Sequence, residues 1–173
     1  MYRRAAEWCR RLLFGKSKMA DIFEEFLDLI KEFNQQQIDY AICGGWAMAI
    51  HGAPRATVDI DLLISSENLQ KAWKIAEELG YSIEGLPLSF DQGIIEIRRI
   101  SKIDEESKTL FTIDFLLVTE GLKRVWETRE NIDFEDDKVW TVSREGLIFM
   151  KRISGRHKDL GDIESLAELE NES

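Results

Sequence analysis

Hydrophobic side chains recur along this chain at two spacings, which predict how helices and strands alternate. Apolar residues three and four positions apart predict helices over 21–35, 66–79 (capped by Ser66) and 143–153. Apolar runs and strict alternation predict strands over 38–43, 57–64, 93–100 and 109–118, and a hairpin over 132–142. Residues 86–92 are expected to form a loop and residues 101–108 a charged turn. This alternation indicates a mixed β-sheet backed by helices.

The segment that follows the first predicted strand contains polar and glycine residues that the hydrophobic pattern does not require. Gly44 and Gly45 open a short helix, and Asp59 and Asp61 lie on the next strand. Strand side chains repeat every two residues, so both carboxylates point to one face, roughly 6.6 Å apart. Two neighbouring anions destabilise a fold unless a cation lies between them, usually a divalent metal. Glycine N–H groups at a helix start suit a phosphate, so the order is that of a nucleotide-using enzyme.

A third carboxylate, Asp114, interrupts the apolar strand predicted over 109–118. It shares one strand face with Leu110, Thr112, Leu116 and Val118. An aspartate there destabilises the fold unless it is paired or bound to metal. The alternative is an aspartate at a strand end that accepts a backbone hydrogen bond. Because two carboxylates precede it in the chain, we favour the metal role.

Composition limits the classes of protein to which this chain can belong. Of its 173 residues, 44% are hydrophobic and 32% charged, as in ordinary globular proteins, and no apolar run approaches the length of a membrane span. Two cysteines form neither a disulfide framework nor a zinc site, which fits a reducing cytoplasm. A net charge of −10 argues against an extended nucleic-acid surface but leaves room for a small nucleotide.

The charge distribution divides the chain into two parts. Residues 1–18 contain six basic side chains and a single glutamate, and we expect them to be a basic N-terminal extension. This extension is either an amphipathic helix that packs on the domain or a partner, or a segment upstream of a start at Met19; we favour a weakly attached helix. Residues 19–173 are expected to form a single domain, with a core over 38–142 and C-terminal helices over 143–170.

The string Gly-Gly-x-Ala-x-x-x-His-Gly-x-x-Arg-x-Thr-x-Asp-Ile-Asp-Leu over residues 44–62, with the later Asp114, resembles the nucleotidyltransferase superfamily. Within this superfamily, which has a DNA polymerase beta-like fold, the string resembles the branch that contains the abortive-infection toxin nucleotidyltransferases and other minimal members. The resemblance covers residues 38–162. It implies an α+β nucleotidyltransferase fold, a mixed β-sheet backed by helices with C-terminal helices. It also implies metal-dependent transfer of a nucleoside monophosphate (NMP) from a nucleoside triphosphate (NTP) to an acceptor hydroxyl.

The resemblance also implies roles for individual residues. Those for catalysis and for binding Mg²⁺ or Mn²⁺ are Asp59, Asp61 and Asp114; those for binding nucleotide are Gly44, Gly45, Arg55, Lys151 and Lys158. Arg55 suits either a phosphate or an aspartate partner. Lys151 and Lys158 match a late Lys…Arg-x-Lys-Asp element of the toxin branch, although lysines on amphipathic helices are usually only solvated. His51 is given no catalytic role, and Trp46 is more often a core residue than a base-stacking platform.

Two other classes of function compete with this interpretation. One is a non-catalytic nucleotide-binding or toxin–antitoxin partner on the same fold, as a homodimer or with another protein; three intact carboxylates argue against it. The other is a metal phosphohydrolase, which would supply histidines near the carboxylates, yet neither His51 nor His157 neighbours Asp114 in the sequence. Which NTP is used, and whether the acceptor is RNA, protein or a small molecule, stays open.

Overall fold

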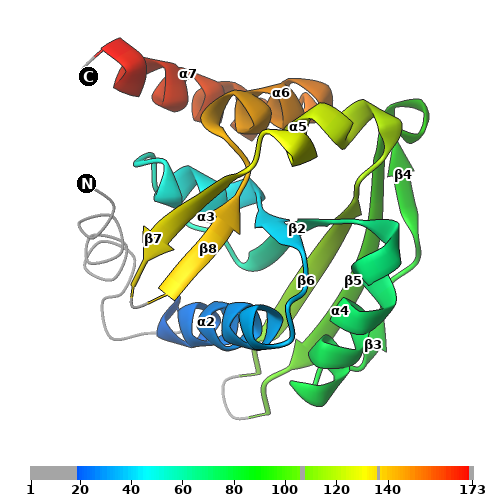
Figure 1. Ribbon diagram of the computed structural model, residues 1–173. Coiled ribbons are helices and arrows are strands. Elements are labelled where there is room, and N and C mark those ends of the chain that lie inside the picture. The colour runs from blue at the N-terminus through cyan, green and yellow to red at the C-terminus, as the bar shows by residue number, and fades with distance from the viewer. Residues whose placement is uncertain (1–18, 106–107, 136, 172–173) are drawn as a thin grey trace.

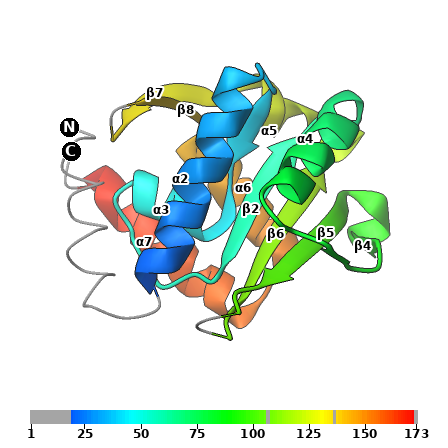
Figure 2. The same ribbon diagram turned by 90° about the horizontal axis from the view of Figure 1, so that it is seen from below.

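The computed structural model describes residues 19–105, 108–135 and 137–171, so the extension predicted over 1–18 lies outside the described residues. A mixed β-sheet forms the middle layer, with α2 and α4 on one side and α6 and α7 on the other (Figures 1 and 2). This is the predicted α+β arrangement of a mixed sheet with helices and two C-terminal helices. None of the helices described is long and apolar enough to cross a membrane.

The elements follow one another in the predicted order. The helices are α2 (Met19–Gln35), α3 (Gly44–Ile50), α4 (Ser66–Glu78), α5 (Lys123–Glu127), α6 (Arg144–Ser154) and α7 (His157–Asn171), with single turns η1 (Asp91–Gly93) and η2 (Glu120–Leu122). The strands are β1 (Tyr40–Ile42), β2 (Asp59–Ile64), β3 (Ile83–Glu84), β4 (Leu88–Phe90), β5 (Ile95–Ile103), β6 (Leu110–Leu117), β7 (Glu130–Phe134) and β8 (Asp137–Thr141).

The sheet has the order β3-β5-β6-β2-β1-β8-β7, with β4 paired to β5. Strands β2 and β6 are parallel neighbours at its centre, whereas β5 runs antiparallel to β6. The two central strands are almost wholly apolar on the face toward α2 and α4, as strands buried on that face must be. Their opposite face is therefore the one on which polar side chains must find partners or ligands.

Aromatic side chains pack α2 against α3 and the sheet. Phe26 stacks on Trp46 with ring centroids 4.3 Å apart, and Phe33 contacts the rings of Tyr40 and Phe115. The Trp46 indole donates a hydrogen bond to the backbone oxygen of Asp59. Trp46 is thus a buried core residue that also fixes the start of the carboxylate strand, as the core interpretation predicts.

Two stretches differ from the prediction. The expected loop over 86–92 contains strand β4 and turn η1, and strand β5 continues into the expected turn as far as Ile103. Short strands such as β4 show too few alternations for periodicity to detect. In the extended part of β5, the hydroxyls of Ser101 and Thr112 bond across the strand pair, so polar residues there continue the sheet.

A smaller correction concerns the start of α4. The cap of this helix is Ser65 rather than the predicted Ser66, and its side chain makes no capping hydrogen bond. By contrast, α6 begins as predicted at Ser143, whose hydroxyl accepts a hydrogen bond from the Gly146 backbone N–H.

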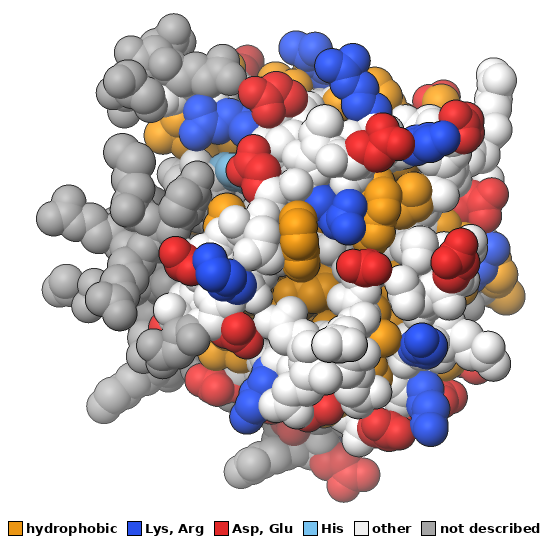
Figure 3. All heavy atoms as spheres, viewed as in Figure 1, with side chains coloured by type: hydrophobic (Ala, Val, Ile, Leu, Met, Phe, Trp, Pro, Cys, Tyr) orange, Lys and Arg blue, Asp and Glu red, His pale blue; other side chains and the backbone are white. Residues whose placement is uncertain are grey.

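The acidic and basic side chains visible in Figure 3 are interspersed, without a continuous basic patch among the described residues of that face.

Candidate active site

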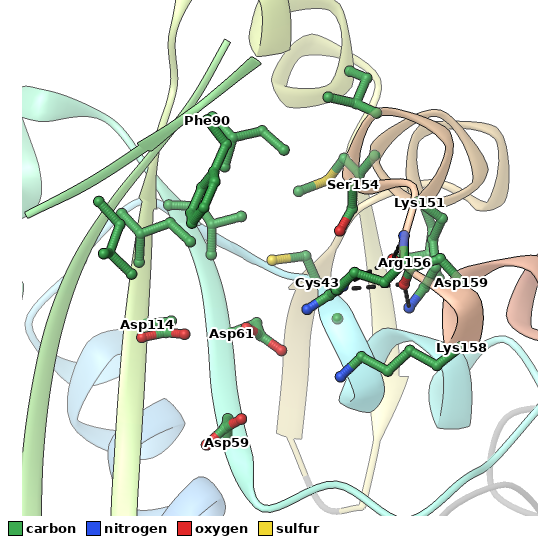
Figure 4. Close-up of a pocket in the computed structure, with 18 of the residues that line it drawn as sticks. Cys43, Asp59, Asp61, Phe90, Asp114, Lys151, Ser154, Arg156, Lys158 and Asp159 are labelled. Carbon is green, nitrogen blue, oxygen red and sulfur yellow. Dashed lines mark hydrogen bonds and ion pairs between the residues drawn. The ribbon is translucent and has the colours of Figure 1, made fainter. Parts of the chain in front are cut away.

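Three aspartates predicted from the sequence meet on one face of the central strands. The register of the parallel pair places Asp61 directly beside Asp114, and Asp59 lies two residues before Asp61 on the same face. Figure 4 shows all three carboxylates along one side of a pocket. Parallel pairing of β2 with β6 therefore joins residues more than fifty positions apart in the chain.

The pocket has a volume of about 520 Å³ and two walls of different origin. Strands β2, β4, β5 and β6 form one wall, while α6 and the start of α7 form the other. Apolar side chains line its upper part in Figure 4, and the carboxylates and several cations line its lower part. The site thus combines an acidic floor with an apolar chamber.

Arg99 occupies both oxygens of Asp114. Its Nε and Nη2 atoms donate to the two carboxylate oxygens at 2.7 Å and 2.6 Å, a bidentate pair between cross-strand neighbours. The side chain of Asp114 is only 6% exposed and that of Arg99 41%. Arg99 was not predicted as a site residue; the alternation of Ile95, Ile97 and Arg99 puts it on this face, but its pairing requires the β5–β6 register.

Asp59 and Asp61 have no comparable partner among the described residues. Burial, with the charges of Asp114 and Asp59, raises the pKa of Asp61 to about 6. Burial and the charge of Asp114 also raise the pKa of Asp59. A carboxylate whose charged form is disfavoured in this way is stabilised by any cation that binds beside it.

The donor set fits a divalent metal held by two protein carboxylates. Among residues 19–105, 108–135 and 137–171, no group of three or more histidine, cysteine and acidic side chains is arranged to hold a metal. Mg²⁺ is commonly bound by one or two carboxylates together with substrate phosphates and water. Asp59 and Asp61 meet that description. Asp114 could join them through the lone pairs that its two hydrogen bonds from Arg99 leave free, or by releasing Arg99.

Gly44 and Gly45 pack closely against β2, which carries Asp59 and Asp61, and against Thr57 just before it. Gly44 has φ +60°, and a Cβ there would overlap the Asp61 carboxylate. A Cβ on Gly45 would lie 2.6 Å from the Cβ of Thr57. Glycine at both positions therefore lets the start of α3 lie directly against β2 and keeps bare backbone beside Asp61.

Two of the predicted phosphate-binding cations are engaged within the protein. Lys151 is buried and pairs with Asp159 at 3.4 Å and with Asp162, while Arg55 pairs with Asp162 at 2.8 Å. Arg156 completes this ion network by pairing with Asp159 at 2.8 Å. Burial opposes ionisation of Asp159, yet hydrogen bonds from Arg156 and nearby cations lower its pKa to about 2. The network ties α7 to α6 and to the loop before β2.

Besides Arg99, the exposed cations near the carboxylates are Lys158 and Arg156, of which Arg156 is also paired with Asp159. Both line the pocket and are exposed, and Figure 4 shows the Lys158 amine directed to the same space as Asp59 and Asp61. The positive charges of Arg99, Lys158 and Arg156 lower the pKa of Asp59, against the larger effect of burial. Arg156 was missed from the sequence, although it is the arginine of the Arg-x-Lys-Asp element. His51 lies outside this group and bonds the backbone oxygen of Val142 at 2.7 Å.

A protein-family comparison covers almost the whole chain. The model of the family described as "Nucleotidyltransferase of unknown function (DUF6036)" matches residues 17–171. No curated protein matches the sequence.

Solved structures share the fold at low sequence identity. The crystal structure of ANT(2″)-Ia in complex with adenylyl-2″-tobramycin matches with a TM-score of 0.60 and 14% identity, covering 86% of this chain and 88% of that one. TM1012 of Thermotoga maritima, described as a "putative nucleotidyltransferase", matches with a TM-score of 0.59 and 14% identity over 89% and 95% of the two chains. Likeness at this identity establishes the nucleotidyltransferase fold and leaves substrates undetermined.

Proposed function

The chain belongs to the family of nucleotidyltransferases of unknown function (DUF6036), and from this premise we propose that it transfers an NMP from an NTP to an acceptor hydroxyl. One observation supports the proposal above the others. Asp59 and Asp61 both line the pocket without an ion-pair partner among the described residues, and Asp61 lies directly against Gly44. A purely structural role would leave this pair of anions uncompensated.

In this proposal Asp59 and Asp61 hold Mg²⁺ or Mn²⁺, and Asp114 completes the set when Arg99 releases it. The metal would supply charge neutralisation at the triphosphate and a lowered pKa for the attacking hydroxyl. Oxygen ligands favour these ions over zinc. While Arg99 holds it, Asp114 instead lies beside the attacking hydroxyl and orients its neighbours.

The nucleotide phosphates would lie between the glycine pair and α7. Gly44 lines one side of this space and Lys158 with Arg156 lines the other. The backbone N–H groups of Gly44 and Gly45 would donate to the phosphates there. We propose that Lys151 and Arg55 act on the nucleotide mainly by holding α7 in place, because both are paired with its aspartates. A direct phosphate contact by either would require it to leave Asp162.

The finer assignment to the toxin-like branch is also proposed. Support comes from the Lys…Arg-x-Lys-Asp element, whose members Lys151, Arg156 and Asp159 form a single ion network beside the pocket. If the chain is such a toxin, its expression should arrest growth, and Asp61→Asn should abolish the arrest. Growth that is equally slowed by wild type and variant would contradict the toxin assignment but not the enzyme.

A labelled-substrate screen tests the central proposal. Each of the four NTPs, labelled at the α-phosphate, is incubated with the protein, Mg²⁺ or Mn²⁺, and separate pools of RNA, protein and small-molecule acceptors. Label should appear in one pool with wild type and not with Asp61→Asn. Transfer that is equal with both proteins, or absent from every pool although nucleotide and metal bind, would contradict catalysis.

A further inference from the structure

We propose that the apolar chamber of the pocket binds the acceptor, and that this acceptor carries its hydroxyl on an uncharged or anionic, apolar ring system. This inference deepens the proposed function and rests on it. The chamber begins at Asp114 and extends toward Phe90, away from Lys158 of α7 (Figure 4). Arg99, which is paired with Asp114, lines it as well.

Strand alternation builds the first wall of the chamber. Ile95 and Ile97 share a face of β5 with Arg99, and Leu116 shares a face of β6 with Asp114. Strand β4 extends the same surface, since Leu88 lies opposite Ile97 and Phe90 opposite Ile95. A continuous apolar strip therefore leads from the Arg99–Asp114 pair to the sheet edge.

Helix α6 forms the facing wall with further apolar side chains. These are Leu147, Met150 and Ile153, spaced three residues apart along one face of the helix. On the sheet side, Phe90 is 51% exposed, so its ring is available to a ligand. The chamber is therefore an apolar slot between the sheet and α6, with an aromatic side chain at its rim. Such a slot suits a flat hydrophobic group.

The geometry of transfer assigns this slot to the acceptor rather than the nucleobase. In phosphoryl transfer the attacking and leaving oxygens lie on opposite sides of the phosphorus. The leaving pyrophosphate needs cations, and Lys158 and Arg156 line the α7 side of the pocket. With the α-phosphate at Asp59 and Asp61, the attacking hydroxyl must then arrive from the side of Asp114, where the slot begins.

Charge further defines the acceptor. Among the described residues that line the slot beyond Asp114, the charged ones are Arg99 and, at the rim, Asp91. A polycationic acceptor such as tobramycin would need carboxylates beside the ammonium groups that it buries, because burying an unpaired ammonium group is costly. The Arg99 guanidinium is paired with Asp114 but is 41% exposed, so it repels an ammonium group and can still donate to a neutral or negatively charged one.

The proposed transfer forms one bond to the α-phosphorus and breaks another. The acceptor oxygen forms a bond to the α-phosphorus, the bond from that phosphorus to its bridging oxygen breaks, and pyrophosphate leaves with the electron pair. The hydroxyl proton passes to a neighbouring carboxylate and on to solvent. An aromatic hydroxyl would suit this site because its anion is easily formed and lies close to Arg99.

Equilibrium binding with defined probes tests the proposal. Naphthol, an uncharged aromatic hydroxyl compound, and tobramycin are titrated into the protein with Mg²⁺, with and without non-hydrolysable analogues of the four NTPs. Phe90→Ala and Leu88→Ala change the slot, and Phe149→Ala is the matched control, because Phe149 is a 44%-exposed phenylalanine of α6 outside the pocket lining. Circular dichroism checks that each variant is folded.

Naphthol should bind more tightly than tobramycin and together with an NTP analogue. Phe90→Ala should weaken naphthol binding about tenfold, with a smaller loss for Leu88→Ala and none for Phe149→Ala. Competition between naphthol and the analogue would assign the slot to the nucleobase and overturn the proposal, as would tighter binding of tobramycin or equal effects of Phe90→Ala and Phe149→Ala. If no analogue binds while naphthol still responds to Phe90, the nucleotidyltransferase function fails and the acceptor role falls with it.

Discussion

The Asp61 carboxylate occupies the space that a side chain at position 44 would need. Because Gly44 has φ +60° and its missing Cβ is replaced by the Asp61 carboxylate, Gly44→Ala must both strain the backbone and displace the carboxylate. We expect this variant to lower the free energy of unfolding by about 2–3 kcal/mol. Urea denaturation measures it.

The control for Gly44 is another glycine in a helix. Gly161 of α7 has no atom within 4 Å of an added Cβ, so Gly161→Ala should leave stability unchanged or raise it by up to about 1 kcal/mol. Equal stability of Gly44→Ala and wild type would show that Asp61 can move freely. The carboxylate site would then be far less rigid than described.

The raised pKa of Asp61 predicts how stability depends on pH in the absence of metal. Its folded pKa of about 6 exceeds its ordinary value of 3.8, so the folded state binds this proton more tightly. Stability from this group is therefore present at low pH and is lost as pH rises from about 4 to about 6, by about 2–3 kcal/mol in all. Denaturation of wild type and Asp61→Asn across this range isolates the effect as their difference.

Metal should reverse that dependence. Mg²⁺ binds the ionised carboxylate, so its apparent affinity should fall as pH drops below about 6. A difference between wild type and Asp61→Asn that is flat with pH would mean that Asp61 ionises as easily in the folded protein as in the unfolded one.

At the level of elements, the ion network holds α7 against α6, and these two helices form one wall of the pocket. Lys151 is buried and neutralises Asp159 and Asp162, so Lys151→Ala leaves buried carboxylates short of a partner. We expect a loss of about 3–5 kcal/mol in unfolding free energy. Arg152→Ala, one residue away and exposed, should change stability by less than about 0.5 kcal/mol. A mild Lys151→Ala variant with weak nucleotide binding would instead support direct phosphate contact.

The elements that sequence could predict are those with strong local patterns. Strands β2 and β6 show long apolar runs, so their position and the shared face of the three aspartates were predictable. The hairpin of β7 and β8 and the helix start at Ser143 also follow from local signals. Such patterns require only neighbours along the chain.

The ion pairs that the sequence did not predict depend on the register and packing of segments distant in the chain. Arg99 pairs with Asp114 only because β5 lies antiparallel to β6 at that register, and β4 was missed because three residues show little periodicity. The partners of Lys151 and Arg55 depend likewise on how α7 packs. Charged residues on the surface of a predicted helix thus give no indication of which ones become buried pairs.

For the molecule as a whole, the net charge of −10 and the clustered carboxylates give one combined expectation. Because cations bind the folded site and not the unfolded chain, Mg²⁺ should raise the melting temperature, and Mg²⁺ with an NTP should raise it further. Ligand at a hundred times its dissociation constant contributes about 2.7 kcal/mol. Asp28→Asn, an exposed substitution of the same kind on α2, should behave as wild type.

Asp61→Asn separates the fold from the function. It removes one of the repelling charges, so the metal-free variant should be about 1–2 kcal/mol more stable than wild type, and the gain with metal should disappear. If Asp61 were only a structural residue, wild type would not respond to metal and the variant would be less stable, because a hydrogen-bond partner would be left unpaired. Thermal melts of wild type, Asp61→Asn and Asp28→Asn, with and without Mg²⁺ and NTP, distinguish the two cases, and the second would leave the nucleotidyltransferase fold without its chemistry.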